Sequence, residues 1–390
     1  MRERAHRMLA IGVEDGLEHW RVDLDRLPET ARYVAQVVRE QYPDLRVPFH
    51  ARWRHFVSNG EDLWAALDRP DRWGSRAARS RAAFDLAITS VLLDAGSGPG
   101  WRFVDPVTER VSTRSEGLAV ASLRMFEFGA FSETDDPLRA DASVLSHLSA
   151  DTLAWGFQAG EENPLVGLEG RAALLRRLGD QAQARPDLFA VADGPRPGGL
   201  YDAMAARALG GRLPAPVILE VLLEALGPIW ENRPSLGGVP LGDCWPHPAM
   251  GGDGFVPLHK LSQWLSYSLV EPLQAAGIEV VDLDGLTGLA EYRNGGLFYD
   301  LGVLALRDST DAEKAWTVDH PLVVGWRSMT VALLDRIAPL VREELGVDAA
   351  AMPLASVLEG GTWAAGRRAA AAAREGGGPP LTILSDGTVF

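Results

Sequence analysis

Cysteine is almost absent from this chain, whose 390 residues include a single cysteine, Cys244. One thiol excludes an intramolecular disulfide, and it also excludes a metal centre built from several cysteines. Because chains without disulfides are typical of reducing compartments, we expect a cytoplasmic protein. The first residues, 1–6, lack the apolar segment of a signal peptide, which agrees with this expectation.

Positive charge and long apolar runs are scarce as well. The 38 Lys and Arg residues face 53 Asp and Glu residues, which gives a formal net charge of −15. A nucleic-acid surface needs a field that attracts phosphate, so no nucleic acid partner is expected, although a local basic pocket for one small phosphate is compatible. The apolar run 215–226 contains two glutamates and is too short to span a bilayer, so we expect no membrane partner.

Strand patterns are also few, whereas helical periodicity recurs along the chain. The one clear strand is predicted at 278–283, a long loop at 227–254, and a small terminal hairpin from 381–384 and 388–390. Because strands and helices do not alternate, a doubly wound sheet does not fit, and we predict a mainly α, multi-helix globular fold with a few short strands. Helices are predicted at 29–41, 76–93, 115–128, 142–155, 168–182, 200–209, 216–226, 258–276, 321–345 and 354–374.

No linker interrupts the chain, so one large helical unit over 1–390 is expected. A subdivision into 1–160 and 161–390 is the alternative.

A glycine-rich segment, 91–100, resembles the first motif of nucleotide-binding methyltransferases. Its context does not fit, because a helix precedes it and no helix follows it. The segment is better interpreted as a helix end and a turn, where Asp94 and Trp101 could still line a pocket.

Two clusters combine side chains that bind small polar ligands. The stretch 49–56 contains His50, Arg52 and His55 among aromatics, a mixture that suits bases and sugars, although a basic aromatic surface is the alternative. A zinc site from the two histidines is disfavoured, because no third ligand accompanies them. Farther along, Lys260 and Gln263, with Trp264, lie beside an apolar stripe of one helix, at the edge of a core where pockets form. A surface lysine is the alternative interpretation of Lys260.

A third cluster, 291–300, places Glu291, Tyr292 and Arg293 next to two glycines. A carboxylate here could stabilise a developing cation, and glycosidic cleavage is a reaction with an oxocarbenium-like transition state. The alternative is an ordinary turn with a Glu–Arg surface pair, which contributes little. The residue types by themselves leave both interpretations open.

Taken together, these segments resemble a family of bacterial and fungal proteins of uracil catabolism, the fourth protein of the fungal pathway. The resemblance covers nearly the whole chain, and its motifs follow one another in the same order. The landmarks are the segments 49–56, 92–103, 124–131, 241–247, 256–273, 288–300 and 360–367, together with the Ser-Asp-Gly-Thr-Val-Phe end.

A more distant similarity points to queuosine-salvage nucleotide hydrolases. Their Ala-Asp-Tyr-Arg motif and its following apolar segment are similar to 290–293 and 301–304, and two of their helices are similar to 260–264 and 327–331. These relatives are helical, DNA-glycosylase-like enzymes that cleave an N-glycosidic bond with an aspartate. Here Glu291 replaces that aspartate, which could shift the carboxylate by ~1.5 Å, so Asp300 is kept as a second candidate.

The resemblance implies an N-ribosyl hydrolase for a small phosphorylated riboside, a ring-opened uridine monophosphate derivative such as ribosylurea 5-phosphate. It implies catalysis by Glu291 or Asp300, without a metal or other cofactor. It also implies that substrate is bound by Lys260, Gln263, Trp264, Tyr292, Arg293, Arg327, Asp94, Trp101, His50, Arg52 and His55. Two alternatives stay open, a non-catalytic ligand-binding or scaffold protein and an amide or ureido hydrolase. The oligomeric state, monomer or homodimer, is also open.

Overall fold

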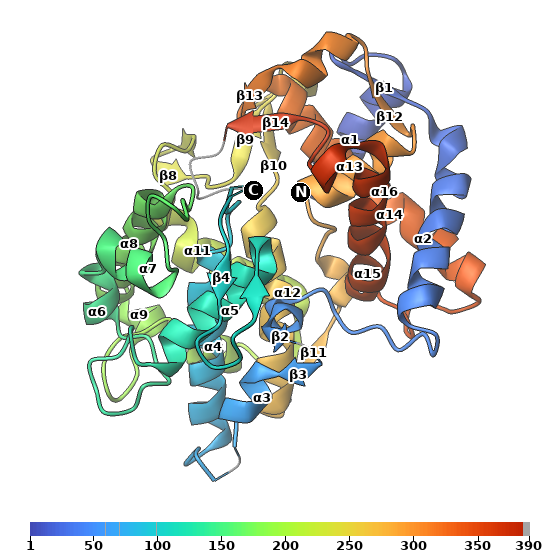
Figure 1. The fold of residues 1–390 in the computed structure, drawn as a ribbon. Helices are drawn as coiled ribbons and strands as arrows, with labels where there is room; N and C mark the ends of the chain where they lie inside the picture. Colours follow the sequence, from blue (N-terminus) through green and yellow to red (C-terminus); the bar gives the residue numbers. More distant parts are fainter. Residues whose placement is uncertain (59, 70, 99, 385–390) are drawn as a thin grey trace. The chain divides into compact units, whose positions relative to one another are not determined.

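A computed structural model describes residues 1–58, 60–69, 71–98 and 100–384, and it confirms a mainly α fold with short strands (Figure 1). The chain forms two compact units, and each takes up separated stretches of sequence. Unit 1 contains Met1–His50, Arg233–Gln263 and Leu283–Leu384. The described part of unit 2 is Ala51–Asn232 and Trp264–Asp282. Within the described residues, no helix is both long and apolar enough to cross a membrane.

Unit 1 is built around α14, the longest helix (Pro321–Leu345). Pro321 starts it, His320 caps it by accepting the Leu322 N–H, and Gly346 ends it in the left-handed conformation. The helices α1, α2 and α13 pack on α14, and α16 packs on both α2 and α13, beside which it is drawn in Figure 1. The other helices of this unit are α1 (Arg2–Val13), α2 (Leu27–Gln41), α13 (Tyr292–Asp300), α15 (Leu354–Ser356) and α16 (Ala364–Ala373).

The predicted helix 354–374 is continuous but contains a π-helical stretch, η7 (Val357–Trp363), between α15 and α16. The strands of unit 1 form separate two-stranded sheets rather than one large sheet. These pairs are β1 (Trp20–Val22) with β12 (Leu304–Leu306), β9 (Cys244–Pro246) with β10 (Phe255–Pro257), β7 (Ser235–Leu236) with β8 (Val239–Pro240), and, in parallel, β13 (Ala315–Thr317) with β14 (Thr382–Leu384).

Unit 2 packs α4 against α5, α8 and α10, and α8 against α6 and α7. Ser75 begins α4 by accepting the Ala78 N–H, which is why the Ala/Arg-rich stretch starts there. The helices are α3 (Leu63–Leu67), α4 (Arg76–Leu92), α5 (Arg114–Glu127), α6 (Ala142–Ser146), α7 (Ala150–Gly156), α8 (Leu168–Ala184), α9 (Pro186–Phe189), α10 (Gly199–Ala205) and α11 (Ala215–Leu226), preceded by the 3₁₀ helix η2 (Arg52–Phe56).

The predicted strand at 278–283 is confirmed as β11 (Glu279–Val281), which pairs in parallel with β6 (Arg212–Pro214). Unit 2 also has two small antiparallel pairs, which are β2 (Val57–Ser58) with β3 (Glu61–Asp62), and β4 (Phe103–Val104) with β5 (Val111–Ser112).

Helix α12 (Lys260–Ala275) carries a proline in its interior, Pro272. Proline has no N–H, so the carbonyl four residues earlier, that of Ser268, loses its helical partner. The indole N–H of Trp53 donates to this carbonyl at 2.6 Å instead. The hydroxyl of Ser268 in turn accepts the Arg52 N–H at 2.9 Å. The proline thus fixes η2 against α12.

Two predictions on helices need correction. The helix predicted at 142–155 is two helices, α6 and α7, because Ser149 caps α7 by accepting the Thr152 N–H. The segment after Glu291, for which no helix was predicted and a turn was one interpretation, forms α13. Its Gly295 is poor for a helix in isolation, but a Cβ there would lie 2.7 Å from the Trp326 ring. The tight packing of these two helices therefore requires the glycine.

The glycine-rich segment after α4 is a helix end and a turn, as predicted, and β4 rather than a helix follows it. The buried guanidinium of Arg171 donates to the carbonyls of Leu93, Ala95 and Gly96 in this turn. The carbonyls left free at a helix end are thus bound by an arginine from α8. The hairpin strand predicted at 388–390 lies outside the described residues, and β14 pairs with β13.

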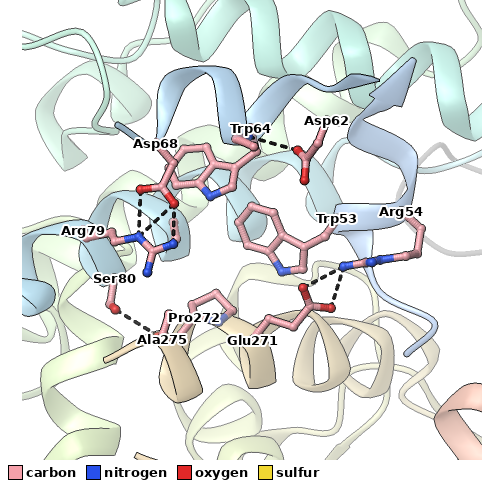
Figure 2. A pocket seen from close by; sticks show the side chains of 12 residues that line it. Trp53, Arg54, Asp62, Trp64, Asp68, Arg79, Ser80, Glu271, Pro272 and Ala275 are labelled. Carbon is pink, nitrogen blue, oxygen red and sulfur yellow. Dashed lines mark hydrogen bonds and ion pairs between the residues drawn. The ribbon is translucent and has the colours of Figure 1, made fainter. Parts of the chain in front are cut away.

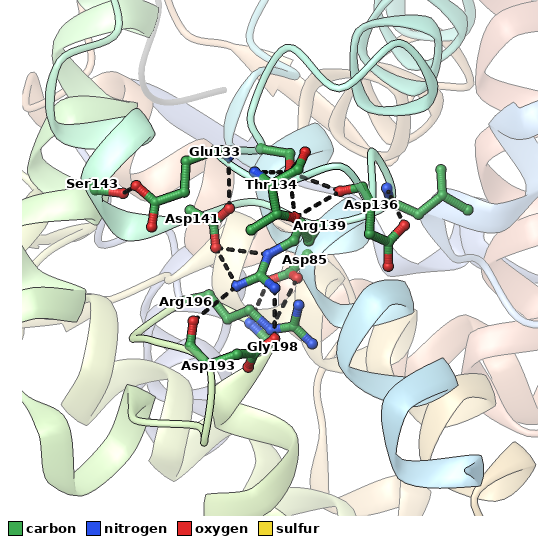
Figure 3. A network of polar contacts seen from close by, with 12 residues as sticks. Asp85, Glu133, Thr134, Asp136, Arg139, Asp141, Ser143, Asp193, Arg196 and Gly198 are labelled. Carbon is green, nitrogen blue, oxygen red and sulfur yellow. Dashed lines mark hydrogen bonds and ion pairs between the residues drawn. The ribbon is translucent and has the colours of Figure 1, made fainter. Parts of the chain in front are cut away.

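A buried polar network joins α4 to the segment before α10 in unit 2 (Figure 3). The carboxylate of Asp85 accepts the Gly198 N–H at 2.6 Å and lies 3.5 Å from the Arg196 Nε. Nearby, Arg139 donates to Asp141 at 2.7 Å. Burial raises the pKa of Asp85 to about 7, against the opposing charge of Arg196.

Stability should therefore depend on the titration of Asp85. Because its folded pKa lies above the unfolded value, the native state holds this proton more tightly, and stability falls as pH rises from about 4 to above 7. We expect the Asp85→Asn variant to lose this part of the pH dependence. Urea unfolding at pH 5 and pH 8 measures it, with Asp151→Asn, on the exposed surface of α7, as the control. An unchanged slope in Asp85→Asn would contradict the assignment.

Candidate functional site

The carboxylate of Glu291 is held at the N-terminus of α13. One oxygen accepts the Arg293 N–H at 2.7 Å, and the other accepts the Asn294 N–H at 2.6 Å. Ser, Thr, Asp and Asn are the usual residues at this position, because a short side chain reaches back most easily. Here a glutamate caps the helix, and it is buried, with only 7% of its surface exposed. The alternative of an exposed Glu–Arg turn pair is therefore wrong.

Burial raises the pKa of Glu291 above its usual range. The two amide hydrogen bonds oppose this increase most strongly, followed by the charges of Lys260 and His50. Each carboxylate oxygen keeps a second lone pair beside its amide bond. The result is a carboxylate that is fixed in position and has a raised pKa, and a higher pKa makes the ionised form a stronger proton acceptor, as a general base requires.

Asp243 connects the elements on both sides of this carboxylate. It binds the buried guanidinium of Arg327 with two contacts of 2.7 Å, and Arg327 also donates to the carbonyl of Ala290, just before Glu291. The same Asp243 carboxylate accepts the Lys260 N–H at 3.0 Å, at the start of α12. Arg327 lowers the pKa of Asp243 far below its usual range. Asp243 therefore positions both Lys260 and the Glu291 segment.

The residue before Lys260, His259, has a φ of +46°, which is uncommon for any residue except glycine. Its N–H donates to the carbonyl of Asp243 at 3.0 Å. Such backbone strain is often found at functional sites, where the surroundings hold it in place. The strain here sets the direction in which α12 starts.

His50 lies in a second buried pair of unit 1. Its Nδ1 is 2.6 Å from a carboxylate oxygen of Glu359, and its ring contacts Trp363 at 5.5 Å between centroids. Both partners belong to the π-helical stretch η7, and π-helical turns occur frequently at functional sites. We call Glu291, Lys260, His50, Glu359 and Asn294 the Glu291 cluster.

Other predicted residues of unit 1 have structural partners. The side-chain oxygen of Gln263 accepts the Thr287 N–H at 3.1 Å and so holds the segment that leads to Glu291. Arg293 donates to the carbonyl of Gly377 at 2.7 Å, and its guanidinium lies 4.8 Å from the ring centre of Tyr292.

Asp300 lies at the other end of α13. A helix of nine residues is about 13 Å long, so this carboxylate is remote from Glu291. Its two oxygens bind Arg374 at 2.6 and 2.7 Å, and its side chain is 3% exposed. Asp300 therefore forms a structural ion pair with Arg374.

The predicted residues of unit 2 form a separate group. Arg52 lies 3.0 Å from Asp94, and the Ser115 hydroxyl donates to Asp94 at 2.7 Å. The ring of His55 contacts Ser115 at 3.1 Å through Nδ1 and lies 5.4 Å from the ring of Trp264. Trp101 is buried in the same unit, where its indole N–H donates to the carbonyl of Phe157 at 3.0 Å. Arg52 thus lies among aromatic rings, those of His55 and Trp264, and also forms an ion pair with Asp94.

Several residues of these groups were not singled out from the sequence. Asp243 lay inside a segment that was noticed, but its pairing with Arg327 spans 84 residues. Asn294, Ser115 and Glu359 carry no local pattern that distinguishes them from surface residues. Among the described residues, no three His, Cys, Asp or Glu side chains are grouped so that they could hold a metal ion.

Comparison with known proteins supports the assignment of the whole chain. A family model described as "Protein of unknown function (DUF1688)" matches residues 1–390. "Protein urg3" from Schizosaccharomyces pombe is 38% identical over 100% of this chain and 96% of its own length. "Uracil catabolism protein 4" from Lachancea kluyveri is 35% identical over 95% of this chain and 92% of its own length. The chain belongs to this family, and the predicted resemblance to proteins of uracil catabolism is confirmed.

Proposed function

Because the chain belongs to this family, we propose that it acts in uracil catabolism as an N-ribosyl hydrolase. The proposed substrate is ribosylurea 5-phosphate, and the products are urea and ribose 5-phosphate. The name of the Lachancea kluyveri relative supports the pathway. The observation that carries the reaction type is the buried, doubly hydrogen-bonded carboxylate of Glu291.

In the proposed reaction, the bond between the anomeric carbon and the urea nitrogen breaks, and positive charge develops on the sugar ring. The carboxylate of Glu291 stabilises this charge and takes a proton from the attacking water, whose oxygen bonds to the anomeric carbon. The departing urea nitrogen gains a proton from solvent, and Glu291 returns the proton taken from water to solvent, so that one water molecule is consumed. The rigid cap favours this role, because the carboxylate does not need to reorganise as charge develops.

Lys260 is the residue that we propose for the substrate phosphate. Arg327 already binds Asp243 through both terminal nitrogens, and Arg293 binds a backbone carbonyl. Lys260 exerts the largest effect of any charged side chain on Glu291. Lys260 is 7% exposed, and the attraction between its ammonium group and a phosphate is stronger in such a desolvated site than in water.

Asn294 is a further candidate for substrate binding. Its side chain is completely buried, and neither its amide oxygen nor its amide nitrogen has a hydrogen-bond partner among the described residues. A buried polar group without a partner costs about 1–3 kcal/mol. The urea group of the substrate or one of its ribose hydroxyl groups would supply these partners. Asn294 lies close to Glu291 in sequence, in the first turn of α13.

We expect Asn294→Leu to lower kcat/KM by about 10- to 100-fold, because a site built to bind a polar group loses that bond. Its free energy of unfolding should stay unchanged or increase, because no hydrogen bond within the protein is removed. Steady-state kinetics and urea unfolding measure both effects. Ser328→Ala is the matched control, since it removes another buried polar group without a partner among the described residues. Full activity in Asn294→Leu would remove this residue from the site.

The function itself is tested with a substrate series. Purified protein is incubated with ribosylurea 5-phosphate, with unphosphorylated ribosylurea and with uridine monophosphate, and the release of urea and of the free sugar is followed. We expect rapid urea release from the first compound and much slower release from the second. Tight binding of ribosylurea 5-phosphate in calorimetry without turnover would instead support a scaffold or ligand-binding protein.

A further inference from the structure

A cavity of about 290 Å³ lies within unit 2 (Figure 2). Its lining contains no residue of the Glu291 cluster and none of the group formed by Arg52, Asp94, Ser115 and His55. The side chains around it come from η2, α3, α4 and α12. Two indole rings, those of Trp53 and Trp64, form its apolar surface, and their centroids are 5.5 Å apart. The helix residues Ala83, Pro272 and Ala275 complete its small-residue surface.

The polar contacts at the cavity hold its surface in one conformation. The Trp53 indole is fixed by the free carbonyl that Pro272 creates in α12. On one side, Arg54 binds both oxygens of Glu271 at 2.7 and 2.6 Å. On the other side, Arg79 binds both oxygens of Asp68, to which the indole of Trp73 also donates. A cavity with fixed surfaces is preorganised for a ligand.

Several donors at this cavity have no partner within the described residues, and one of them, the Nε of Arg54, is also buried. The indole N–H of Trp64 makes no hydrogen bond there, and Figure 2 shows it on the side of the ring that faces Arg79. Arg79 donates to Asp68 through Nε and Nη2. Its Nη1 makes no hydrogen bond to the described residues. The acceptors of Asp68 are already occupied. A ligand that brings acceptors can therefore be bound by these donors.

The charges of the lining restrict the ligand further. The two arginines face three carboxylates, those of Asp68, Glu271 and Asp62, so negative charge is in excess. An anionic ligand is therefore disfavoured, whereas a neutral carbonyl group is not. The indole rings offer flat apolar faces on which planar rings stack. Carbonyl acceptors and a planar ring together describe an uncharged heterocycle with ring carbonyls.

We propose that this cavity in unit 2 is a second small-molecule site, which binds a neutral planar heterocycle bearing ring carbonyls, the class to which pyrimidine bases belong. The ring lies against Trp53 and Trp64, and its carbonyl groups accept from Trp64 Nε1 and Arg79 Nη1. The proposal is independent of the reaction at Glu291, because the lining residues belong to unit 2 and none is needed for the proposed chemistry.

Binding of uracil to the full chain tests the proposal. Calorimetry and tryptophan fluorescence are measured with uracil, with benzoate as a planar anion and with choline as a cation. We expect uracil to bind more tightly than benzoate or choline. Trp64→Phe keeps the aromatic ring but removes the donor, and should weaken uracil binding by about 3- to 10-fold.

A second variant fills the cavity without removing a polar contact. Ala275→Leu adds volume near the end of α12, and we expect it to abolish uracil binding at this site while the thermal unfolding profile is retained. Trp155→Phe, at a tryptophan that is 73% exposed, is the fluorescence control. Uracil binding that is unchanged in both Trp64→Phe and Ala275→Leu, or preferential binding of benzoate or choline, would overturn the proposal. Loss of ribosylurea turnover in other variants does not bear on it.

Discussion

Glu291→Gln is expected to lower kcat/KM for ribosylurea 5-phosphate by about 10²- to 10⁴-fold, the range of a general base that is lost. The amide cannot take a proton from water or stabilise the charge on the sugar ring. It can still accept one of the two helix N–H bonds, whereas its NH₂ group faces the other donor. We therefore also expect a loss of about 0.5–2 kcal/mol in stability, as for a damaged helix cap.

The Glu291→Asp variant separates charge from position. Aspartate is a preferred capping residue, so stability should be restored, and the retained charge should recover part of the rate. The pH profile gives an independent readout. Because the pKa of Glu291 is raised, its ionised form is lost as pH falls through a value above that of an ordinary glutamate, and the acid limb of kcat/KM should lie there. Glu291→Gln should abolish this limb.

Asp300→Asn discriminates between the two candidate carboxylates. This substitution breaks the ion pair with Arg374, so we expect lower stability with little change in kcat. A rate loss in Asp300→Asn as large as that in Glu291→Gln would transfer the catalytic role to Asp300 and contradict the assignment.

Asp243→Ala should reduce the free energy of unfolding by about 3–5 kcal/mol, because it leaves a buried charge without its partner. The side chain of Arg327 is 1% exposed, and Asp243 is its ionic partner. The same change removes the acceptor for the Lys260 N–H, so activity should fall as well. Urea unfolding monitored by circular dichroism measures the stability effect.

A double-mutant cycle tests whether the effect comes from the pair. Replacing both side chains, as Asp243→Leu with Arg327→Met, should cost less than Asp243→Ala alone, because no unpaired charge stays buried. Activity should not return in the double variant, since the contacts to Ala290 and Lys260 are also lost. A loss below about 1 kcal/mol in Asp243→Ala would show that the pair contributes no more than a surface ion pair.

The sequence predicted the fold class and most long helices because their apolar periodicity is local. The helix 321–345, for example, has its proline start and glycine end within its own sequence. Helix α13 was missed because Gly295 disfavours a helix by itself, and only its contact with Trp326 explains it. Local patterns do not encode such packing.

Only some residues of the candidate site could be singled out from the sequence, because the roles of the others depend on contacts between distant parts of the chain. Glu291, Lys260 and His50 were singled out by residue type and given roles through the resemblance, and the charges of Lys260 and His50 act on the Glu291 carboxylate within unit 1. The role of Asp243 depends on a partner 84 residues away, and a single sequence contains no signal for that pairing. The importance of Asn294 depends on its burial without a partner, which only a structure can reveal.

The most direct measurement follows the glycosidic nitrogen itself. Ribosylurea 5-phosphate labelled with ¹⁵N at the atom bonded to the sugar is incubated with the protein, and the products are identified by NMR and mass spectrometry. Cleavage of the N-glycosidic bond predicts that the label appears in urea, together with an equal amount of ribose 5-phosphate. Label in ribosylamine 5-phosphate or ammonia would show hydrolysis within the ureido group and would contradict the proposed function.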